Sequence, residues 1–139
     1  TGGQFSPLSG VGTKATTAPY MNIDREFDTV ELASAAGATF VARTTVYHVK
    51  QLQSMLKKAI KHDGFSVLEV LTQCPTYFGR KNRKGSAVDM INNYRDTTVP
   101  IGSDKKKENP ELIERGIFVD KNLPEYCQAY AELVERASA

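Results

Sequence analysis

The feature that most constrains the fold is a segment, residues 39–71, in which the hydrophobic pattern changes twice. Residues 39–44 (TFVART) and 65–71 (FSVLEVL) are rich in β-branched and aromatic side chains and have the length of buried strands. Between them, apolar residues recur every three to four positions from Val49 to Ile60, with lysines on the remaining face, which predicts an amphipathic helix. A strand, a helix and a strand in this order normally give a parallel strand pair with a right-handed crossover.

Helical patterns flank this unit on both sides. A short amphipathic helix is predicted from Asp28, and Gly37 would end it in the left-handed region. Further helices are predicted over residues 87–94 and 124–138, whereas residues 102–109 are expected to form a charged surface loop. The terminal helix is expected to turn four side chains inward: Tyr126, Tyr130, Leu133 and Val134. The sequence therefore predicts an α/β fold with a mostly parallel sheet and helices on both faces.

Length and composition exclude several classes of protein. At 139 residues the chain is the size of one domain, and its 40% apolar and 24% charged residues are typical of a globular protein. The net charge of +2 is too small to indicate nucleic-acid binding through bulk charge. No apolar stretch approaches the roughly 20 residues that cross a bilayer, and the N-terminus has no signal-peptide pattern. We therefore expect a soluble, cytoplasmic protein that binds neither nucleic acid nor a membrane.

Two predicted loops are candidates for a binding function. Residues 1–23 contain four glycines and two prolines among Ser and Thr, without periodicity. Loops of this length inside compact domains are uncommon unless they bind something. Residues 72–86 (TQCPTYFGRKNRKGS) follow the carboxyl end of the second strand, where ligands usually sit in open α/β sheets.

Two short motifs invite a phosphate or nucleic-acid interpretation. GVGTK at residues 10–14 resembles a phosphate-binding loop, but its Lys does not directly follow the last Gly, no Ser or Thr follows the Lys, and no strand precedes it. The basic run at residues 80–84 lies beside Tyr77 and Phe78, whose rings could stack on bases. Because runs this short are usually solvated, an RNA-binding domain is kept only as a rival that salt-dependent affinity would reveal.

Histidine and cysteine spacings do not by themselves build a site. His48 and His62 have no third ligand at a plausible spacing and are interpreted as structural, and no nucleophile-elbow motif supports a hydrolase triad. Cys74 directly precedes Pro75, and its spacing alone predicts a buried thiol, because a zinc or iron–sulfur site needs about four ligands. Cys127 is expected to be a small core residue of the last helix. Two distant cysteines do not indicate a disulfide framework.

Several strings form a specific set: TGGQFSP at residues 1–7, TKATTAP at 13–19, AAGATFVAR at 35–43, HDGFSVLEVLTQCPT at 62–76 and FGRKN at 78–82. Together they resemble the beta, thiamine-diphosphate-binding subunit of the 2-oxoacid:ferredoxin oxidoreductases. The resemblance covers nearly the whole chain and weakens after about Asp96. Residues 64–82 are most similar to the 2-oxoglutarate members, with the pyruvate and branched-chain members as alternatives.

The resemblance implies that the chain begins inside a longer protein, and the opening residues, which lack an initiator Met, favour the same interpretation. In the family, the N-terminal half of the subunit carries three cluster cysteines and a Gly-Asp-Gly motif that holds magnesium and the cofactor's diphosphate. We therefore expect residues 1–95 to be the C-terminal half of a thiamine-diphosphate-binding domain, and residues 96–139 to be a C-terminal extension with a terminal helix.

The resemblance also implies two sets of site residues. One is the segment that lines the cofactor and substrate pocket, which corresponds to Thr1, Gly2, Gly3 and Gln4; glycines suit close backbone approach to a bulky ligand. The other is Cys74, which matches the family's fourth ligand to a 4Fe-4S cluster. Its three partner cysteines would come from the other half of the subunit, which removes the objection to a lone cysteine.

The reaction implied is decarboxylation of a 2-oxoacid, with 2-oxoglutarate first among the candidates, by thiamine diphosphate and Mg²⁺. Electrons would pass through a 4Fe-4S cluster to ferredoxin, and coenzyme A would capture the acyl group. The implied protein partners are an alpha subunit and further subunits of the oxidoreductase. No residue is assigned as a general acid or base, and Arg43 and His48 are only conceivable substrate contacts.

Two further expectations concern the chain by itself. It should be inactive alone, and it should self-associate or exchange elements, because a truncated sheet edge exposes apolar surface and unpaired strand groups. The rival interpretation is a non-catalytic α/β interaction module that retains the family's sequence.

Overall fold

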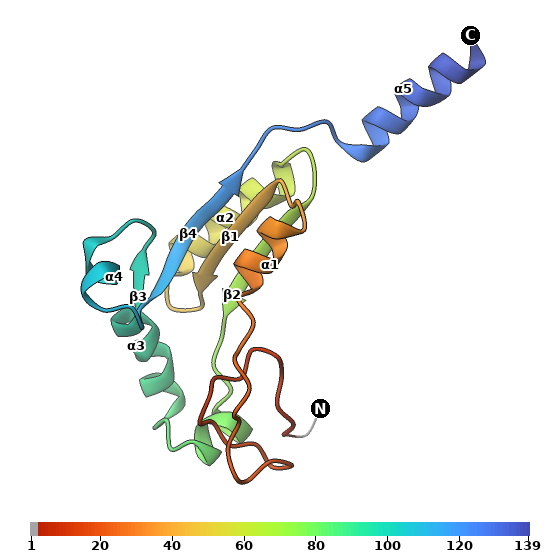
Figure 1. Ribbon diagram of the computed structural model, residues 1–139. Coiled ribbons are helices and arrows are strands. Elements are labelled where there is room, and N and C mark those ends of the chain that lie inside the picture. Colours follow the sequence, from red (N-terminus) through yellow and green to blue (C-terminus); the bar gives the residue numbers. More distant parts are fainter. Residues whose placement is uncertain (1–2) are drawn as a thin grey trace.

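A computed structural model describes residues 3–139 and contains a four-stranded mixed sheet with helices on both faces (Figure 1). In chain order its elements are α1 (Thr29–Ala35), β1 (Phe40–Thr45), α2 (Val49–Lys61), β2 (Ser66–Leu71), the π-helical turn η1 (Pro75–Gly79), α3 (Ala87–Thr97), β3 (Thr98–Pro100), α4 (Asp104–Glu108), β4 (Ile113–Asp120) and α5 (Tyr126–Ser138). The strand order is β2-β1-β4-β3. Strands β1 and β2, and β3 and β4, pair in parallel, whereas β1 and β4 are antiparallel. The predicted α/β class with a mostly parallel sheet is confirmed.

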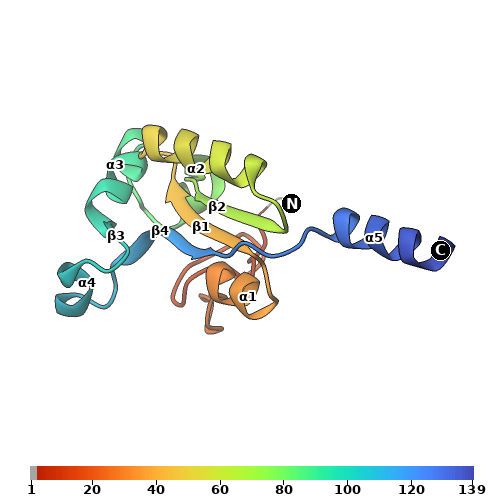
Figure 2. The same ribbon diagram turned by 90° about the horizontal axis from the view of Figure 1, so that it is seen from above.

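The central strand β1 feeds two cores, one on each face of the sheet. Successive side chains of a strand point to opposite faces. Val41 accordingly packs with Val30 of α1, while Phe40 and Ala42 pack with Met55 of α2. Figure 2 shows α1 and α2 on opposite sides of the strands. The predicted arrangement of residues 39–71 and the predicted helices on both faces are thus confirmed.

Helix α1 begins and ends as its sequence predicts. The Asp28 carboxylate accepts hydrogen bonds from the backbone N–H groups of Val30 (2.8 Å) and Glu31 (3.0 Å), which are otherwise unpaired at a helix start. Gly37 follows the helix with φ +89°, in the left-handed region expected of it.

Residues 96–123, for which the sequence predicts no strand, contain the strands β3 and β4, and the expectation of a loop over residues 102–109 is wrong at its centre. There Asp104–Glu108 form the short helix α4, and Lys106 donates to the carbonyls of Pro110 and Leu112, both at 2.7 Å. These bonds tie α4 to the segment that enters β4. Strand β4 lies between β1 and β3. The division of the chain at residue 95 stays a prediction.

The terminal helix α5 forms as predicted, but the expectation that its apolar side chains turn inward is wrong. Tyr126 is 76% exposed, and three further large side chains of the same face are about half-exposed: Tyr130, Leu133 and Val134. Figures 1 and 2 show why: α5 projects away from the sheet and has no element to pack against within residues 3–139. Cys127, expected in a core, is exposed for the same reason.

Across residues 3–139, no helix combines the length and the apolar character that crossing a bilayer requires.

Candidate functional site

The candidate site is a hollow of about 240 Å³ beyond the carboxyl end of β2. It lies between the opening loop and the segment around η1, which are far apart in the sequence but side by side at the lower end of the molecule (Figure 1). The lining residues are Gly3, Gln4, Phe5, Ser9, Lys14, Ala15, Thr16, Cys74, Tyr77, Phe78 and Lys81. Gly3, Gln4 and Cys74, singled out separately in the sequence, therefore share one hollow. Thr1 and Gly2 lie outside the described residues.

The two walls of the hollow are joined by one side chain, Asn82. Its Oδ1 accepts the backbone N–H of Lys14 at 2.7 Å, and its Nδ2 donates to the Lys14 carbonyl at 3.0 Å. The same Nδ2 group donates to the Phe78 carbonyl at 2.9 Å. A side-chain amide has one acceptor and two donor hydrogens, which suits it to bridging two backbone segments in this way. Asn82 was noticed in the sequence only as part of the FGRKN string.

The opening loop is ordered by its own polar contacts. Asn22 is 6% exposed, and its Nδ2 donates to the carbonyls of Ser9 at 2.6 Å and Asp24 at 3.0 Å. Gly3 accepts the backbone N–H of Thr16 at 2.8 Å. A Cβ on Gly3 would lie 2.5 Å from Thr16 Oγ1, and the residue has φ +97°. The chain's own packing thus requires glycine here, in addition to any ligand that approaches it.

Cys74 sits at the start of η1 and is exposed, so the interpretation of a buried thiol is wrong. The reason is that β2 ends at Leu71 and the chain turns out of the sheet before the cysteine. The backbone N–H groups of Phe78 and Tyr77, with a smaller effect of Thr76, hold the pKa of the Cys74 thiol below its usual value despite slight desolvation. Unpaired backbone N–H groups at the start of a helical turn favour a negative charge beside them, and here they favour the thiolate.

The turn itself is fixed by close packing. The Gly79 N–H donates to the Cys74 carbonyl at 2.8 Å and closes the turn. A Cβ on Gly79 would lie 2.5 Å from the sulfur of Met90 and 3.2 Å from the Cys74 carbonyl oxygen, so helix α3 packs closely against η1 at this glycine. Pro75, at the first position of the turn, lacks the N–H that would be unpaired there. The thiol is therefore presented by a rigid turn.

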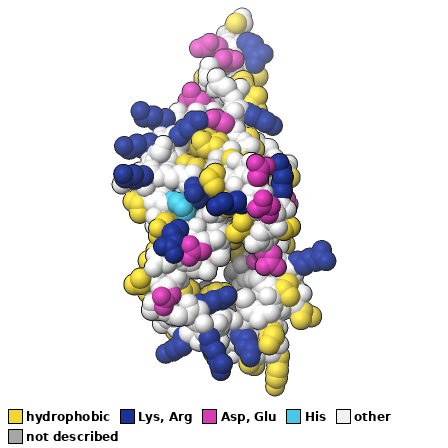
Figure 3. Space-filling view, turned by 90° about the vertical axis from the view of Figure 1, so that its left-hand side faces the viewer, with side chains coloured by type: hydrophobic (Ala, Val, Ile, Leu, Met, Phe, Trp, Pro, Cys, Tyr) yellow, Lys and Arg dark blue, Asp and Glu magenta, His cyan; other side chains and the backbone are white. Residues whose placement is uncertain are grey.

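Charge in the hollow is of one sign. Among its lining residues the only charged side chains are Lys14 and Lys81, one on each wall. Figure 3 shows Lys and Arg side chains gathered at the lower end of the molecule, where these segments lie. In the sequence, Lys14 belongs to the GVGTK string, which does not match a phosphate-binding loop, and Lys81 belongs to a short basic run. Their shared position depends on the tertiary fold, and the hollow suits an anionic ligand.

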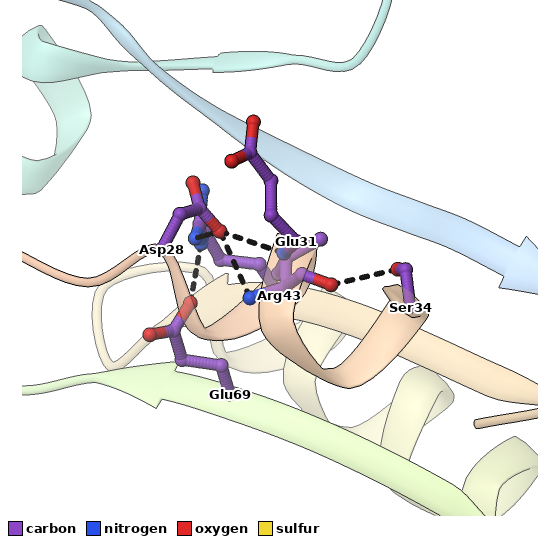
Figure 4. Close-up of polar contacts among 6 residues, drawn as sticks. Asp28, Glu31, Ser34, Arg43 and Glu69 are labelled. Atoms are coloured by element: carbon purple, nitrogen blue, oxygen red, sulfur yellow. Dashed lines mark hydrogen bonds and ion pairs between the residues drawn. The ribbon is translucent and has the colours of Figure 1, made fainter. Parts of the chain in front are cut away.

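Arg43, named as a conceivable substrate contact, is occupied within the sheet (Figure 4). Its side chain is 11% exposed and pairs with Glu69, which is equally buried, and with Asp28 at 2.7 Å. Burial lowers the pKa of Arg43, but the two carboxylates outweigh it and hold the pKa above its ordinary value. Burial likewise opposes ionisation of Asp28, yet the Glu31 N–H and then Arg43 bring its pKa below the usual range. This guanidinium is already matched by two carboxylates and does not line the hollow.

His48 is also remote from the hollow. It lies at the start of α2, with Nδ1 2.9 Å from Thr45 Oγ1. Burial, and then the positive charge of Arg115, lower the pKa of His48 and favour its neutral form. His62 is 2.9 Å from Thr39 Oγ1 through Nε2, which links the end of α2 to the start of β1. Both histidines thus make local contacts that connect α2 to β1.

A known protein family matches the half of the chain that contains the opening loop. A family model described as thiamine pyrophosphate enzyme, C-terminal TPP binding domain, matches residues 1–70, half of the chain. The chain belongs to this family. The matched TPP-binding region includes the opening loop, α1, β1, α2 and most of β2.

Individual relatives are similar in sequence to this chain over more residues than the family model covers. The 2-oxoglutarate synthase subunit KorB of Methanothermobacter marburgensis is 43% identical over 99% of this chain and 50% of its own length. The KorB protein of Methanocaldococcus jannaschii is 42% identical over 98% of this chain and 52% of its own length. The 2-oxoacid:ferredoxin oxidoreductase subunit beta of Saccharolobus solfataricus is 46% identical, but over only 55% of this chain. The chain spans about half the length of the curated KorB relatives it matches.

One solved structure shares the fold of this chain. It is the 2-oxoglutarate:ferredoxin oxidoreductase from Magnetococcus marinus with 2-oxoglutarate, coenzyme A and succinyl-CoA bound, at a TM-score of 0.80 and 24% identity. The match covers 98% of this chain and 48% of that chain. The fold of this chain is therefore one that occurs in that enzyme.

Proposed function

We propose that this chain is part of the TPP-binding subunit of a 2-oxoacid:ferredoxin oxidoreductase, and that its 2-oxoacid is 2-oxoglutarate. The observation that carries the proposal is the extent of the KorB matches, which run over 98–99% of this chain. A beta subunit with the broader 2-oxoacid name matches over only 55%. The similarity to the KorB proteins thus extends beyond the shared TPP-binding region, and this favours 2-oxoglutarate over pyruvate or branched-chain 2-oxoacids.

Thiamine diphosphate, when bound, supplies the carbanion-stabilising thiazolium that a 2-oxoacid decarboxylase needs. The described residues fit the edge of such a site. The opening loop is held rigidly by Asn22 and Asn82, and its Gly3 and Gln4 face a hollow at the carboxyl ends of parallel strands, where cofactors bind in α/β folds. Residues 3–139 bring no three His, Cys, Asp or Glu side chains together around a metal position. The Mg²⁺ ligands in this proposal lie in the other half of the subunit.

Cys74 fits the role of one ligand to a 4Fe-4S cluster. The thiolate is the metal-binding form of cysteine, and the lowered pKa of Cys74 favours it. Iron needs access to the sulfur, and Cys74 is exposed at the mouth of a hollow. Lys14 and Lys81 stand where they would offset the negative charge of a thiolate-bound cluster, which raises its reduction potential. One thiolate cannot hold a cluster, so the proposal assigns the other three to the remaining half of the subunit.

The proposal is tested by completing the chain. The 139 residues are fused to the part of the Methanothermobacter marburgensis protein that lies outside the match, and the fusion and the chain alone are titrated with thiamine diphosphate and Mg²⁺ by calorimetry. We expect binding to the fusion only. Reduction of a ferredoxin or viologen acceptor, with coenzyme A and the alpha subunit present, should be fastest with 2-oxoglutarate. Faster turnover of pyruvate would overturn the substrate assignment, and a fusion that folds without binding the cofactor would support a non-catalytic module.

The cluster ligand is tested by Cys74→Ser in the same fusion, with Cys127→Ser as the matched control. We expect Cys74→Ser to lose iron and acid-labile sulfide, or to convert the cluster signal in electron paramagnetic resonance, whereas Cys127→Ser keeps both. Unchanged iron content and spectrum in Cys74→Ser would remove Cys74 from the site. These readouts do not depend on turnover of any 2-oxoacid.

A further inference from the structure

Asn82 is anchored in the wall of the hollow that carries Cys74. Its backbone N–H donates to the Phe78 carbonyl at 3.0 Å, and its side-chain Nδ2 donates to the same oxygen at 2.9 Å. Next along the chain, the Lys84 N–H donates to the Gly79 carbonyl at 2.9 Å. The Gly79 N–H in turn donates to the Cys74 carbonyl at 2.8 Å. Asn82 therefore belongs to the same hydrogen-bonded turn as the cysteine.

The side chain of Asn82 reaches across to the other wall, the opening loop. Its Oδ1 accepts the N–H of Lys14 at 2.7 Å, and its Nδ2 donates to the Lys14 carbonyl at 3.0 Å. One amide thus holds both backbone groups of one residue, which fixes the direction of the loop at this point as well as its distance. Close by in the same loop, the Thr16 N–H donates to the Gly3 carbonyl at 2.8 Å. The contact made by Asn82 is therefore connected to the residues that line the hollow.

The two walls share no other hydrogen bond within the part of the chain that the structure describes. Across residues 3–139, each bond that runs from residues 3–23 to residues 74–84 joins Lys14 to Asn82. Both segments lie beyond the lower end of the sheet (Figure 1), where the backbone ladder between β1 and β2 does not reach. The side chain of Asn82 is thus the polar contact that sets how far apart the walls stand.

We infer that Asn82 is a positioning residue, which sets the separation between the wall that carries Gly3 and Gln4 and the wall that carries Cys74. The inference rests on the proposed function, in which the first wall borders thiamine diphosphate and Cys74 binds a 4Fe-4S cluster. The rate of electron transfer falls steeply as two centres move apart, so a spacing that drifts would slow the passage of electrons to the cluster. Asn82 is not among the residues that line the hollow, and it therefore acts through the two walls.

The chemistry of the amide explains why this position calls for asparagine. The side chain accepts a hydrogen bond from Lys14 and donates to the carbonyls of Lys14 and Phe78, which uses its acceptor and both of its donor hydrogens. Aspartate could accept from Lys14 but could make neither of the donated bonds. Glutamine has the same polar groups on a longer side chain, so it can restore the bonds only by changing the spacing of the walls. Asn82→Gln is therefore the conservative variant against which Asn82→Ala is compared.

The first test measures the spacing of the walls in the 139-residue chain. Spin labels are attached to Tyr20→Cys in the opening loop and to Lys84→Cys beyond η1, in a chain without other cysteines, and electron paramagnetic resonance reports the distances between them. Tyr20 is 94% exposed and Lys84 is exposed, so the labels displace no buried side chain. We expect a narrow distribution of distances that becomes broader with Asn82→Ala. Asn93→Ala, which removes an exposed amide of the same kind from α3, is the matched control and should leave the distribution narrow.

The second test uses the fusion described above, in which the other half of the subunit is present. Iron content and the affinity for thiamine diphosphate are measured first, and stopped-flow absorbance then follows reduction of the cluster after mixing with 2-oxoglutarate. We expect Asn82→Ala to keep the iron and the affinity but to reduce the cluster about tenfold more slowly or worse, because a displacement of about 1 Å can have an effect of this size. Asn82→Gln should recover part of the lost rate, and Asn93→Ala should match the parent fusion.

The outcomes distinguish this inference from the proposed function. A parent fusion that binds no thiamine diphosphate would overturn the proposed function and the electron-transfer role together, while the spin labels would still decide whether Asn82 sets the spacing. A parent fusion that is active, combined with a normal rate of cluster reduction in Asn82→Ala, would overturn the inference alone. A distribution of distances that stays narrow in Asn82→Ala would overturn it as well. Circular dichroism checks that every variant folds.

Discussion

The centre of the sheet and the region beyond its carboxyl end are built in opposite ways. In β1, Phe40, Val41 and Ala42 are fully buried, and the polar Arg43 that follows is matched by two carboxylates. The opening loop and η1 bury little apolar surface and are held instead by the side-chain amides of Asn22 and Asn82. The sheet is stabilised by apolar burial, and the loops are ordered by side-chain hydrogen bonds to the backbone.

The residues that stabilise the fold are therefore different from the residues that line the hollow. Burying a large apolar side chain contributes more to the free energy of folding than forming a surface hydrogen bond, so the sheet supplies most of the stability. The loop region contributes less and can therefore leave a thiol, two lysines and a hollow open to a ligand. Substitutions should therefore reduce stability most in the core of the sheet, less at the buried ion pairs and the Asn82 bridge, and least at the exposed thiol.

The largest effect is expected at Phe40. It is fully buried, so Phe40→Ala should lower the free energy of unfolding by about 3–5 kcal/mol, from lost burial and the cavity left behind. The matched control is Phe65→Ala, in which the same side chain is 68% exposed, and its effect should be under about 1 kcal/mol. Urea unfolding followed by circular dichroism measures both. Similar losses for the two variants would mean that the core is not where the packing places it.

The second effect concerns the buried ion pairs of β1. Arg43→Met leaves the carboxylate of Glu69 buried without a partner, and we expect a loss of about 3 kcal/mol. Asp28, which is 39% exposed, should contribute little of this because water can solvate it. Arg95→Met, which removes an exposed pair with Asp96, is the control and should change the unfolding midpoint much less. Equal midpoints for the two variants would show that Arg43 has no special role.

The third effect tests the bridge across the hollow. Asn82→Ala removes the hydrogen bonds to both backbone groups of Lys14 and should lower global stability by only about 1 kcal/mol. The local consequence should be larger: the amide of Lys14 loses its acceptor and should exchange with solvent faster in hydrogen-exchange mass spectrometry. Peptides from β1 should exchange at unchanged rates. A uniform rise in exchange would contradict the separation of loop and sheet.

The sheet could be predicted only where local pattern decides structure. Within residues 39–71, the strands are recognised by their β-branched and aromatic composition, since β1 is buried on both faces, and the helix by its three-to-four-residue repeat, since α2 buries one side. Strand β4 escaped prediction because Glu114, Arg115 and Gly116 interrupt its apolar run. Their partners are remote: Glu114 accepts the N–H of Gly102 at 2.9 Å, and Arg115 donates to Gln51 at 2.9 Å. Sequence shows that these residues are polar but not that tertiary contacts pair them.

The site could be predicted in part. The family's strings pointed to Gly3, Gln4 and Cys74, and the fold brings them to one hollow; their contact with a cofactor or cluster stays a prediction. Lys14 and Lys81 were missed because they lie 67 positions apart, and their segments meet in the tertiary fold, where Asn82 hydrogen-bonds to Lys14. The prediction that the apolar face of α5 turns inward was wrong for a related reason. Amphipathic spacing predicts that a helix has an apolar face, but it does not predict which surface covers that face.

The smallest effect on stability is expected at Cys74, where chemistry should change most. Because the thiol is exposed, Cys74→Ser should leave the free energy of unfolding within about 0.5 kcal/mol of the parent chain. The lowered pKa means that the thiolate persists to lower pH than in a free thiol, since the N–H groups of Phe78 and Tyr77 stabilise the charged form.

Alkylation by iodoacetamide, followed by mass spectrometry in a Cys127→Ser background, should therefore show a pH midpoint below that of N-acetylcysteine. Disrupting the turn with Gly79→Val should raise that midpoint, because the N–H groups would no longer converge on the sulfur. A midpoint equal to that of N-acetylcysteine in the parent chain would show that η1 orders the backbone without activating the thiol.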